Sequence, residues 1–385
     1  MKKPLLIVII ILIVVFALPV INFIRWSAQE KKPMDIVIVD KTVPTLERLK
    51  HKSLTWILTN ERFAKKEKKS SYSYRKDYYG FSPTRPLKER GSSKHEYHIS
   101  EIIELADSVD ALYIADTYGV FFNEWWAGIN KTRRSRKIFG GLSNTDYLLI
   151  NEMKNRNKLI ILEYNSFDYP TPPFEAYRAQ EKLGITFSGW TGKYFEKLDS
   201  TDYDFPLWLT AMYRKQYKKP WTFTKAGIVL LTEKNIVVLE EGTHLKNKLP
   251  HILTDSLNCQ KFGVPASVAF GNWFDIINPL ESNVISRFKI ETTILGDTIL
   301  SSNMLTNEFP AVIQEPANKR IYYFSGDFAT NKVWYWTSRL KGFDKHKGIL
   351  YSKNPDDTRR FFWLYYKPLI NSIFSDYYNS INSKK

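Results

Sequence analysis

Cysteine is nearly absent from this chain of 385 residues, which contains only Cys259. A single thiol rules out an internal disulfide and any metal site built from several cysteines. The phosphate-binding motifs GxGxxG and GxxxxGK[ST] are also missing, so nothing supports a nucleotide cofactor. The sequence therefore predicts no cofactor and no metal site.

Motifs of hydrolytic enzymes are missing as well. Ser166 lies outside any GxSxG motif, and no histidine has a motif-supported place beside it, which favours an ordinary turn serine. His95 and His98 lie three apart in a polar segment without the HExxH pattern. His244 follows a strand-like segment and is interpreted as part of a surface turn.

Positive charge is abundant, with a formal net charge of +16. A field of this sign favours anionic partners such as lipid headgroups, anionic envelope polymers or nucleic acid. The segment Lys131–Lys137 (KTRRSRK) follows the acidic stretch around Asp116 and Glu124 in the chain. Such a run is usually a solvated loop, and lining the mouth of a cleft is the alternative that its position suggests.

The amino terminus contains a long apolar run, Leu5–Ile24, preceded by Lys2 and Lys3. A helix of this length matches the ~30 Å hydrocarbon core of a bilayer. The run exceeds the core of a cleavable signal peptide, so it predicts an uncleaved transmembrane signal-anchor, with cleavage as the alternative. The expected location is the cell membrane, single-pass, with the bulk of the chain extracytoplasmic. Behind such an anchor, nucleic acid is not an expected partner.

Strand-like and helix-like segments alternate up to about residue 195. Alternation of this kind argues for an α/β fold with a mostly parallel sheet and helices on both faces. Strands are expected at Ile36–Val39, Asp77–Phe81, Ala111–Ala115, Lys158–Phe167 and Ile185–Phe195, and helices at Leu46–Phe63, Ser100–Asp110, Leu142–Asn157 and Phe174–Leu183.

The pattern becomes richer in strands after residue 200. A helix is expected at Pro206–Tyr217 and hairpins at Ala226–Glu240 and Phe309–Phe328, with further strands including Ile290–Leu300. The aromatic segment Phe361–Tyr378 predicts a terminal amphipathic helix. We expect an anchor and linker over 1–32, an α/β domain over 33–200, and a β-rich extension over 201–385 that completes the same body.

The alternation from Ile36 to Phe195, with a sharp turn at Glu163–Phe167 (EYNSF), resembles the class I glutamine-amidotransferase-like (flavodoxin-like) superfamily. The hairpin Phe309–Asp327, whose second strand ends in Gly-Asp, is similar to the closing strands of that superfamily. The resemblance implies the scaffold over about half of the chain. Its amidotransferases need a cysteine after the central strand, and none stands in EYNSF, so glutamine hydrolysis is not expected.

Three apolar strand-like segments are each followed by an acidic residue, namely Asp116, Glu163 and Asp327. A fourth acid, Glu124, follows Asp116 by eight residues. Ligands of open α/β sheets bind outside the carboxyl ends of strands. We therefore expect the acids to share one site, where two of them could act as the carboxylate pair of a glycoside hydrolase. The predicted catalytic residues are Asp116, Glu124, Glu163 and Asp327. Capping of helices and pairing with basic loops remain the ordinary alternatives.

Aromatic residues make up 15% of the chain and could supply flat faces that stack on sugars. The predicted ligand-binding residues are Tyr118, Trp125, Trp126, Arg133, Arg134, Asn165 and Trp190. The first functional hypothesis is a protein that binds envelope polysaccharide or anionic polymer during polysaccharide export or assembly. The second is a polysaccharide-active hydrolase, and the third is a scaffold subunit bound to proteins of a membrane complex.

Overall fold

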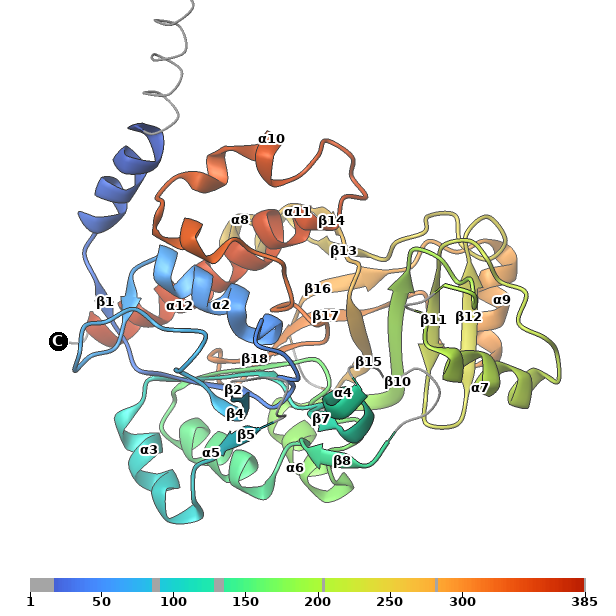
Figure 1. Ribbon diagram of the computed structural model, residues 1–385, viewed down its shortest axis with the longest axis horizontal. Coiled ribbons are helices and arrows are strands. Elements are labelled where there is room, and N and C mark those ends of the chain that lie inside the picture. Colours follow the sequence, from blue (N-terminus) through green and yellow to red (C-terminus); the bar gives the residue numbers. More distant parts are fainter. Residues whose placement is uncertain (1–16, 85–90, 128–134, 203–204, 281–282, 384–385) are drawn as a thin grey trace, which may run out of the picture.

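A computed structural model describes residues 17–84, 91–127, 135–202, 205–280 and 283–383. Its largest element is a ten-stranded sheet across the middle of the molecule (Figure 1). The strand order is β14 (Ser267–Ala269), β13 (His251–Thr254), β16 (Asn283–Lys289), β17 (Glu308–Gln314), β18 (Ile321–Phe324), β9 (Leu159–Glu163), β6 (Ala111–Asp116), β2 (Ile36–Asp40), β4 (Tyr79–Pro83) and β5 (Ser92–His95).

Only the central part of this sheet is parallel. Strands β18, β9, β6, β2 and β4 run in one direction. The remaining five neighbouring pairs in the described sheet are antiparallel. The prediction of a mostly parallel sheet is therefore wrong, because hairpins after residue 200 extend one edge and β5 folds back on the other.

Helices cover both faces of the parallel part. Residues of β2 and β6 alternate between two cores, as the two-residue period of a strand requires. Ile38 and Tyr113 pack toward α2 (Leu49–Asn60) and α12 (Lys367–Asn382). Val39 and Ile114 pack toward the opposite layer, which comprises α3 (Ile102–Ser108), α5 (Asn144–Asn155) and α6 (Pro173–Leu183) (Figure 1).

A second sheet of four antiparallel strands lies beside the first. Its order is β12 (Ile236–Glu240), β11 (Gly227–Leu231), β10 (Ile185–Phe195) and β15 (Trp273–Pro279). Helix α7 (Leu207–Tyr217) packs on one of its faces. The expected strand at 185–195 is thus present, but it belongs to this second sheet, and β18 takes the place beside β9.

The expected strand Ile290–Leu300 is wrong, because the structure has helix α9 (Ile294–Ser302) there. Thr293 caps this helix by accepting a hydrogen bond from Gly296 N at 3.2 Å. The remaining elements are strands β1 (Lys32–Pro33), β3 (Phe63–Ala64), β7 (Val120–Phe121) and β8 (Lys137–Phe139), α4 (Phe122–Ala127), α8 (Ser256–Phe262), α10 (Lys347–Leu350) and α11 (Arg359–Phe361), the π-helix Phe362–Tyr366, and the 3₁₀ helices Ile99–Glu101, Tyr335–Arg339 and Phe343–Lys345.

Residues 17–27 form a helix at the edge of the body. Trp26 at its end is buried and donates from Nε1 to the carbonyl of Thr59 at 2.9 Å. Over the ranges that the structure describes, no helix combines the length and apolar character needed to cross a bilayer. This finding contradicts the predicted signal-anchor and the single-pass membrane location. Residues 5–16 of the predicted span lie outside the described residues.

Candidate ligand-binding cleft

Two of the predicted acids meet at one ammonium group. Asp116 ends β6, Asp327 follows β18, and Lys50 lies in the first turn of α2. Lys50 Nζ is 2.9 Å from Asp116 Oδ2 and 2.6 Å from Asp327 Oδ2. These two distances together place the carboxylate oxygens no more than 5.5 Å apart. The sheet therefore brings together acids that lie far apart in the sequence.

The charges of this group depend on one another. Burial opposes the charged form of Lys50, but the nearby carboxylates of Asp116 and Asp327 outweigh burial and raise the pKa of Lys50. Burial raises the pKa of Asp116, while the charge of Lys50 opposes that rise. Asp116 Oδ1 also accepts from Thr42 Oγ1 and from Tyr118 N, both at 2.7 Å. The three side chains form a mostly buried ionic cluster.

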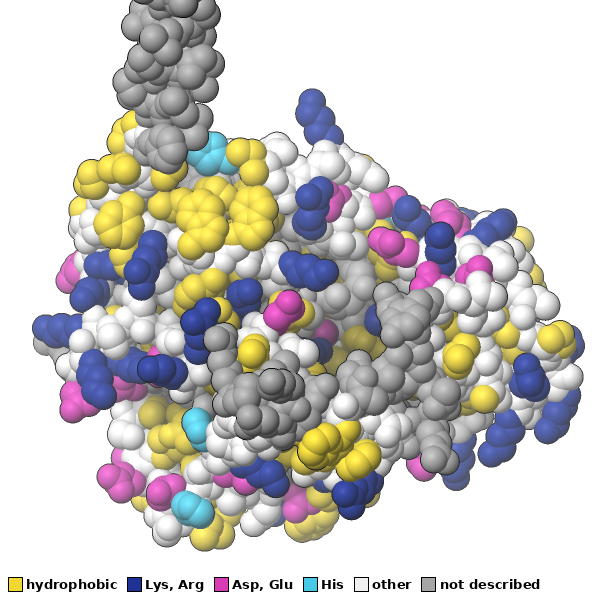
Figure 2. Space-filling model, in the orientation of Figure 1, with side chains coloured by type: hydrophobic (Ala, Val, Ile, Leu, Met, Phe, Trp, Pro, Cys, Tyr) yellow, Lys and Arg dark blue, Asp and Glu magenta, His cyan; other side chains and the backbone are white. Residues whose placement is uncertain are grey.

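A cavity of about 280 Å³ opens above this cluster, and the surface is hollowed near the middle of the view in Figure 2. Asp116 and Lys50 line this cavity and are called its floor, whereas Asp327 does not line it. Its lining is rich in aromatic side chains and comes from both sheets. The remaining lining residues are Thr42, Tyr118, Glu124, Tyr164, Asn165, Asp168, Tyr169, Thr191, Pro206, Trp208, Leu231 and Trp273.

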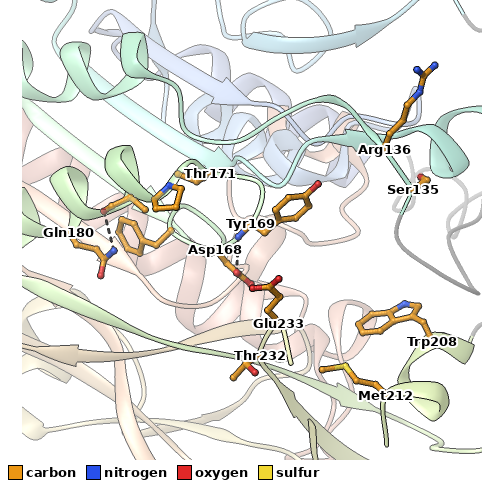
Figure 3. A pocket seen from close by; sticks show the side chains of 13 residues that line it. Ser135, Arg136, Asp168, Tyr169, Thr171, Gln180, Trp208, Met212, Thr232 and Glu233 are labelled. Carbon is orange, nitrogen blue, oxygen red and sulfur yellow. Dashed lines mark hydrogen bonds between the residues drawn. The ribbon is translucent and has the colours of Figure 1, made fainter. Parts of the chain in front are cut away.

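A larger cavity of about 860 Å³ adjoins the first and shares Asp168, Tyr169 and Trp208 with it. Figure 3 shows its lining. Trp208 and Met212 come from α7, Gln180 comes from α6, and Glu233 comes from the turn between β11 and β12. Because the two cavities share three lining residues, they lie side by side, and together they are called the cleft.

Glu163 has a different position from the one predicted. Its carboxylate is fully buried, accepts from the hydroxyl of Tyr113, and accepts from the backbone N–H groups of Phe328 and Ala329, both at 3.0 Å. Burial raises the pKa of Glu163 well above its ordinary value. This acid holds the chain after β18 in place and does not line the cleft.

The predicted ligand-binding residues separate into several groups. Tyr118 and Asn165 line the cleft. Trp125 is buried against Phe81, and Trp190 is buried in the main core, so neither offers a face to a ligand. Trp126 is half-exposed on α4 but lines none of the cavities described here. Arg133 and Arg134 lie outside the described residues.

The turn after β9 is sharp. Asn165 has a φ of 70°, in the left-handed region, and its N–H donates to Asp275 Oδ2 at 3.0 Å. The same oxygen accepts from the hydroxyl of Tyr323 at 2.7 Å. Burial raises the pKa of Asp275 to about 8, although these two hydrogen bonds oppose the rise. The turn is thus fixed by a buried carboxyl from the second sheet.

Sequence reasoning missed Lys50, His51 and Asp275. His51 Nδ1 is 2.5 Å from Asp40 Oδ2, and its Nε2–H donates to the carbonyl of Tyr74 at 2.7 Å, which fixes the start of α2. Lys50 gave little signal in the sequence, because it lies ten residues after the end of β2, in the first turn of α2. No group of three or more His, Cys, Asp or Glu in the described part of the chain is arranged to hold a metal.

No protein-family model and no curated protein matches this chain. One similar solved structure is a protein from Bacteroides uniformis described as ThuA-like, with 8% identity, a TM-score of 0.34, and coverage of 78% of this chain and 84% of that chain. Another is a β-galactosidase from Bacillus circulans, with 9% identity, a TM-score of 0.34, and coverage of 84% of this chain and 32% of that chain. Likeness this weak carries no argument about fold or function.

Proposed function

We propose that this protein binds a carbohydrate polymer along the cleft between its two sheets. The observation that supports this proposal most is that aromatic walls and a charged floor line two adjoining cavities. Binding sites for small polar ligands typically combine apolar walls with a few well-placed polar groups. A cleft longer than one cavity suits a chain of linked units better than a single small molecule.

The wall residue Trp273 shows how such binding would work. Its ring lies 6.4 Å from that of Tyr164, with the planes inclined by 19°. Trp273 is partly exposed and can present a flat apolar face to the apolar side of a sugar ring. Asp116 and Asn165 on the floor would then accept or donate hydrogen bonds to sugar hydroxyls.

We also infer that the scaffold is amidotransferase-like and has lost its nucleophile. The parallel strands occur in the order β4-β2-β6-β9-β18, which is the 2-1-3-4-5 order of one common doubly wound sheet. Asn165 stands at the turn after β9 with the left-handed backbone typical of a nucleophile elbow. An amide there cannot attack a carbonyl, which supports binding over acyl transfer.

Polysaccharide retention tests the proposal. The full chain should be retarded in gels that contain a soluble polysaccharide, and Trp273→Ala should weaken binding by about tenfold, which corresponds to ~1.4 kcal/mol. Trp334→Ala is the matched control, because Trp334 is 61% exposed and lines neither cavity. If a broad panel of neutral and acidic polysaccharides retards the chain no more than a basic control protein, the proposal fails.

A second candidate is glycan hydrolysis by Asp116 and Asp327. Retaining glycosidases hold their two carboxyl groups about 5–5.5 Å apart, and the shared contact with Lys50 keeps the Oδ2 atoms of Asp116 and Asp327 within 5.5 Å of each other. The raised pKa of Asp116 suits a general acid. Against this candidate, Lys50 forms ion pairs with both acids, and Asp327 does not line the cavity.

Turnover separates the two candidates. A hydrolase should release reducing ends from a bound polysaccharide, and Asp116→Asn or Asp327→Asn should abolish release while circular dichroism shows an unchanged fold. A binding protein should release none with the wild-type chain. Binding without turnover across the panel therefore excludes the second candidate and leaves the first intact.

A further inference from the structure

A second lysine, Lys193, lies beside the same cleft. It lies on β10 directly opposite Trp273 of β15 in the antiparallel register. Thr191 is two residues away on the same strand, so Thr191 and Lys193 project from the same face. Both Thr191 and Trp273 line the cleft. Lys193 therefore lies on the same strand face as Thr191, next to the cleft, although it is not among the residues that line the two cavities.

The ammonium group of Lys193 lies between aromatic rings. Its Nζ is 5.2 Å from the ring centre of Trp273 and 5.0 Å from that of Phe195. Rings attract a cation through their negative faces, but they do not replace a counter-ion. No ion pair joins Lys193 to a carboxylate among the residues that the structure describes. This contrasts with Lys50, which has two carboxylates.

The environment of Lys193 disfavours its charge. Burial lowers the pKa of Lys193, the positive charge of Lys50 lowers it further, and Asp327 opposes the shift. A partly buried ammonium group without a counter-ion is costly. An anionic ligand group at this position would remove that cost, whereas Lys50 already pairs with two carboxylates.

We infer that the polymer bound in this cleft is an acidic glycan, and that Lys193 pairs with its anionic substituent while Trp273 stacks on the sugar ring. This inference rests on the proposed carbohydrate binding. It assigns Lys193 as the residue that distinguishes acidic from neutral chains. A carboxylate, sulfate or phosphate on the sugar would supply the same charge.

The test compares matched acidic and neutral polymers on the full chain. Polygalacturonate and its carboxyl-reduced form differ only in the acidic group, and a sulfated galactan distinguishes a carboxylate from a sulfate. Calorimetry at fixed ionic strength should give about tenfold tighter binding to one of the acidic polymers than to the neutral one, as expected for one hydrogen-bonded ion pair.

Lys193→Met keeps a long apolar side chain between the rings but removes the charge. This variant should lose the tenfold preference, whereas Lys193→Arg should retain most of it. Lys197→Met is the control, because Lys197 is exposed and its loss changes the net charge equally. If Lys193→Met does not fold, Lys193→Gln gives the same comparison.

Three outcomes would overturn the inference. Equal wild-type binding of acidic and neutral polymers would refute it and leave the proposed function standing. The same holds if Lys193→Met and Lys197→Met reduce the preference equally, because net charge alone would then explain it. Absence of binding to every polymer would refute the proposed function, and this inference with it.

Discussion

Buried carboxyl groups around the cleft have clearly different surroundings. Asp116 has an ammonium partner, whereas Asp275 is fully buried and pairs with no ammonium group among the described residues. Asp275 Oδ1 makes no hydrogen bond within the described structure. Because burial raises its pKa to about 8, Asp275 is mainly protonated at neutral pH. Its ionised form would have to be desolvated without compensation, which is costly.

This difference predicts how stability depends on pH. The pKa of Asp275 is about 8 in the folded chain, against an ordinary value of 3.8. Between these values the folded state holds a proton that the unfolded state has released, so the free energy of unfolding should fall as pH rises from about 4 to 8. Asp275→Asn, which mimics the protonated form, should remove this part of the fall.

Thermal unfolding at pH 5 and pH 8 measures the effect. We expect Asp275→Asn to melt above the wild-type chain at both pH values, by a clearly larger margin at pH 8 than at pH 5. Asp255→Asn is a suitable control, since Asp255 lies on the surface and its pKa is lowered by a hydrogen bond from Asn258 N. If the melting temperatures of the wild type and Asp275→Asn differ by the same amount at both pH values, Asp275 does not titrate in this range.

At the scale of elements, the turn between β9 and α6 carries the most constrained backbone of the cleft. Asn165 adopts a φ of 70°, which costs ordinary L residues about 1–2 kcal/mol and β-branched residues more. Asn165→Gly should therefore change the free energy of unfolding by less than about 1 kcal/mol. Asn165→Val should lower it by about 2 kcal/mol.

Urea unfolding of the two variants checks this prediction. Thr191→Val introduces the same side chain where strand β10 suits it, and should cost little. Equal stabilities of Asn165→Val and Asn165→Gly would mean that the backbone at this turn relaxes without cost.

Element types were largely predictable, but element partners were not. Helix α6 ends at Gly184, whose φ of 65° permits the left-handed cap that the sequence indicates. Strand β10 was also expected, yet its apolar pattern does not say which sheet it joins. That choice depends on pairing with β11 and β15, which lie 32 or more residues further along the chain.

The residues of the candidate cleft were also only partly predictable from the sequence. Asp116 follows a clear strand and lines the cleft, as expected. Glu163 follows an equally clear strand but points into the core, because Tyr113 and the backbone of Phe328 occupy the space beside it. Lys50 gave little signal, since a lysine in the first turn of a helix usually points into solvent. Side-chain direction at a strand end is set by neighbours that the sequence does not place.

At the scale of the molecule, the two sheets are joined beside the cleft. Phe274 of β15 forms an isolated antiparallel bridge with Gly326, the residue before Asp327. Asp275 N donates to the carbonyl of Ser325 at 2.6 Å, and Asp327 N donates to that of Trp273 at 2.9 Å. This short junction fixes the aromatic wall relative to the ionic floor.

Gly326→Ala should weaken the junction. A Cβ atom at Gly326 would lie 2.5 Å from the ring of Phe328 and 2.8 Å from that of Phe270, both of which are fully buried. Overpacking of this kind typically costs about 1–3 kcal/mol. We expect a lower urea midpoint with an unchanged slope, together with weaker polysaccharide binding.

Gly348→Ala is the matched control, because a Cβ atom there would meet nothing within 4 Å. If Gly326→Ala unfolds at the wild-type urea concentration, the rings have room to shift and the junction is less tightly packed than the distances indicate.

The bridge between Phe274 and Gly326 couples ligand binding in the cleft to the stability of the junction between the two sheets. A ligand that contacts both walls would stabilise the junction between the two sheets, which are otherwise joined there by a few backbone hydrogen bonds. Ligand binding would then slow the exchange of the amide hydrogens of Asp275 and Asp327 with heavy water.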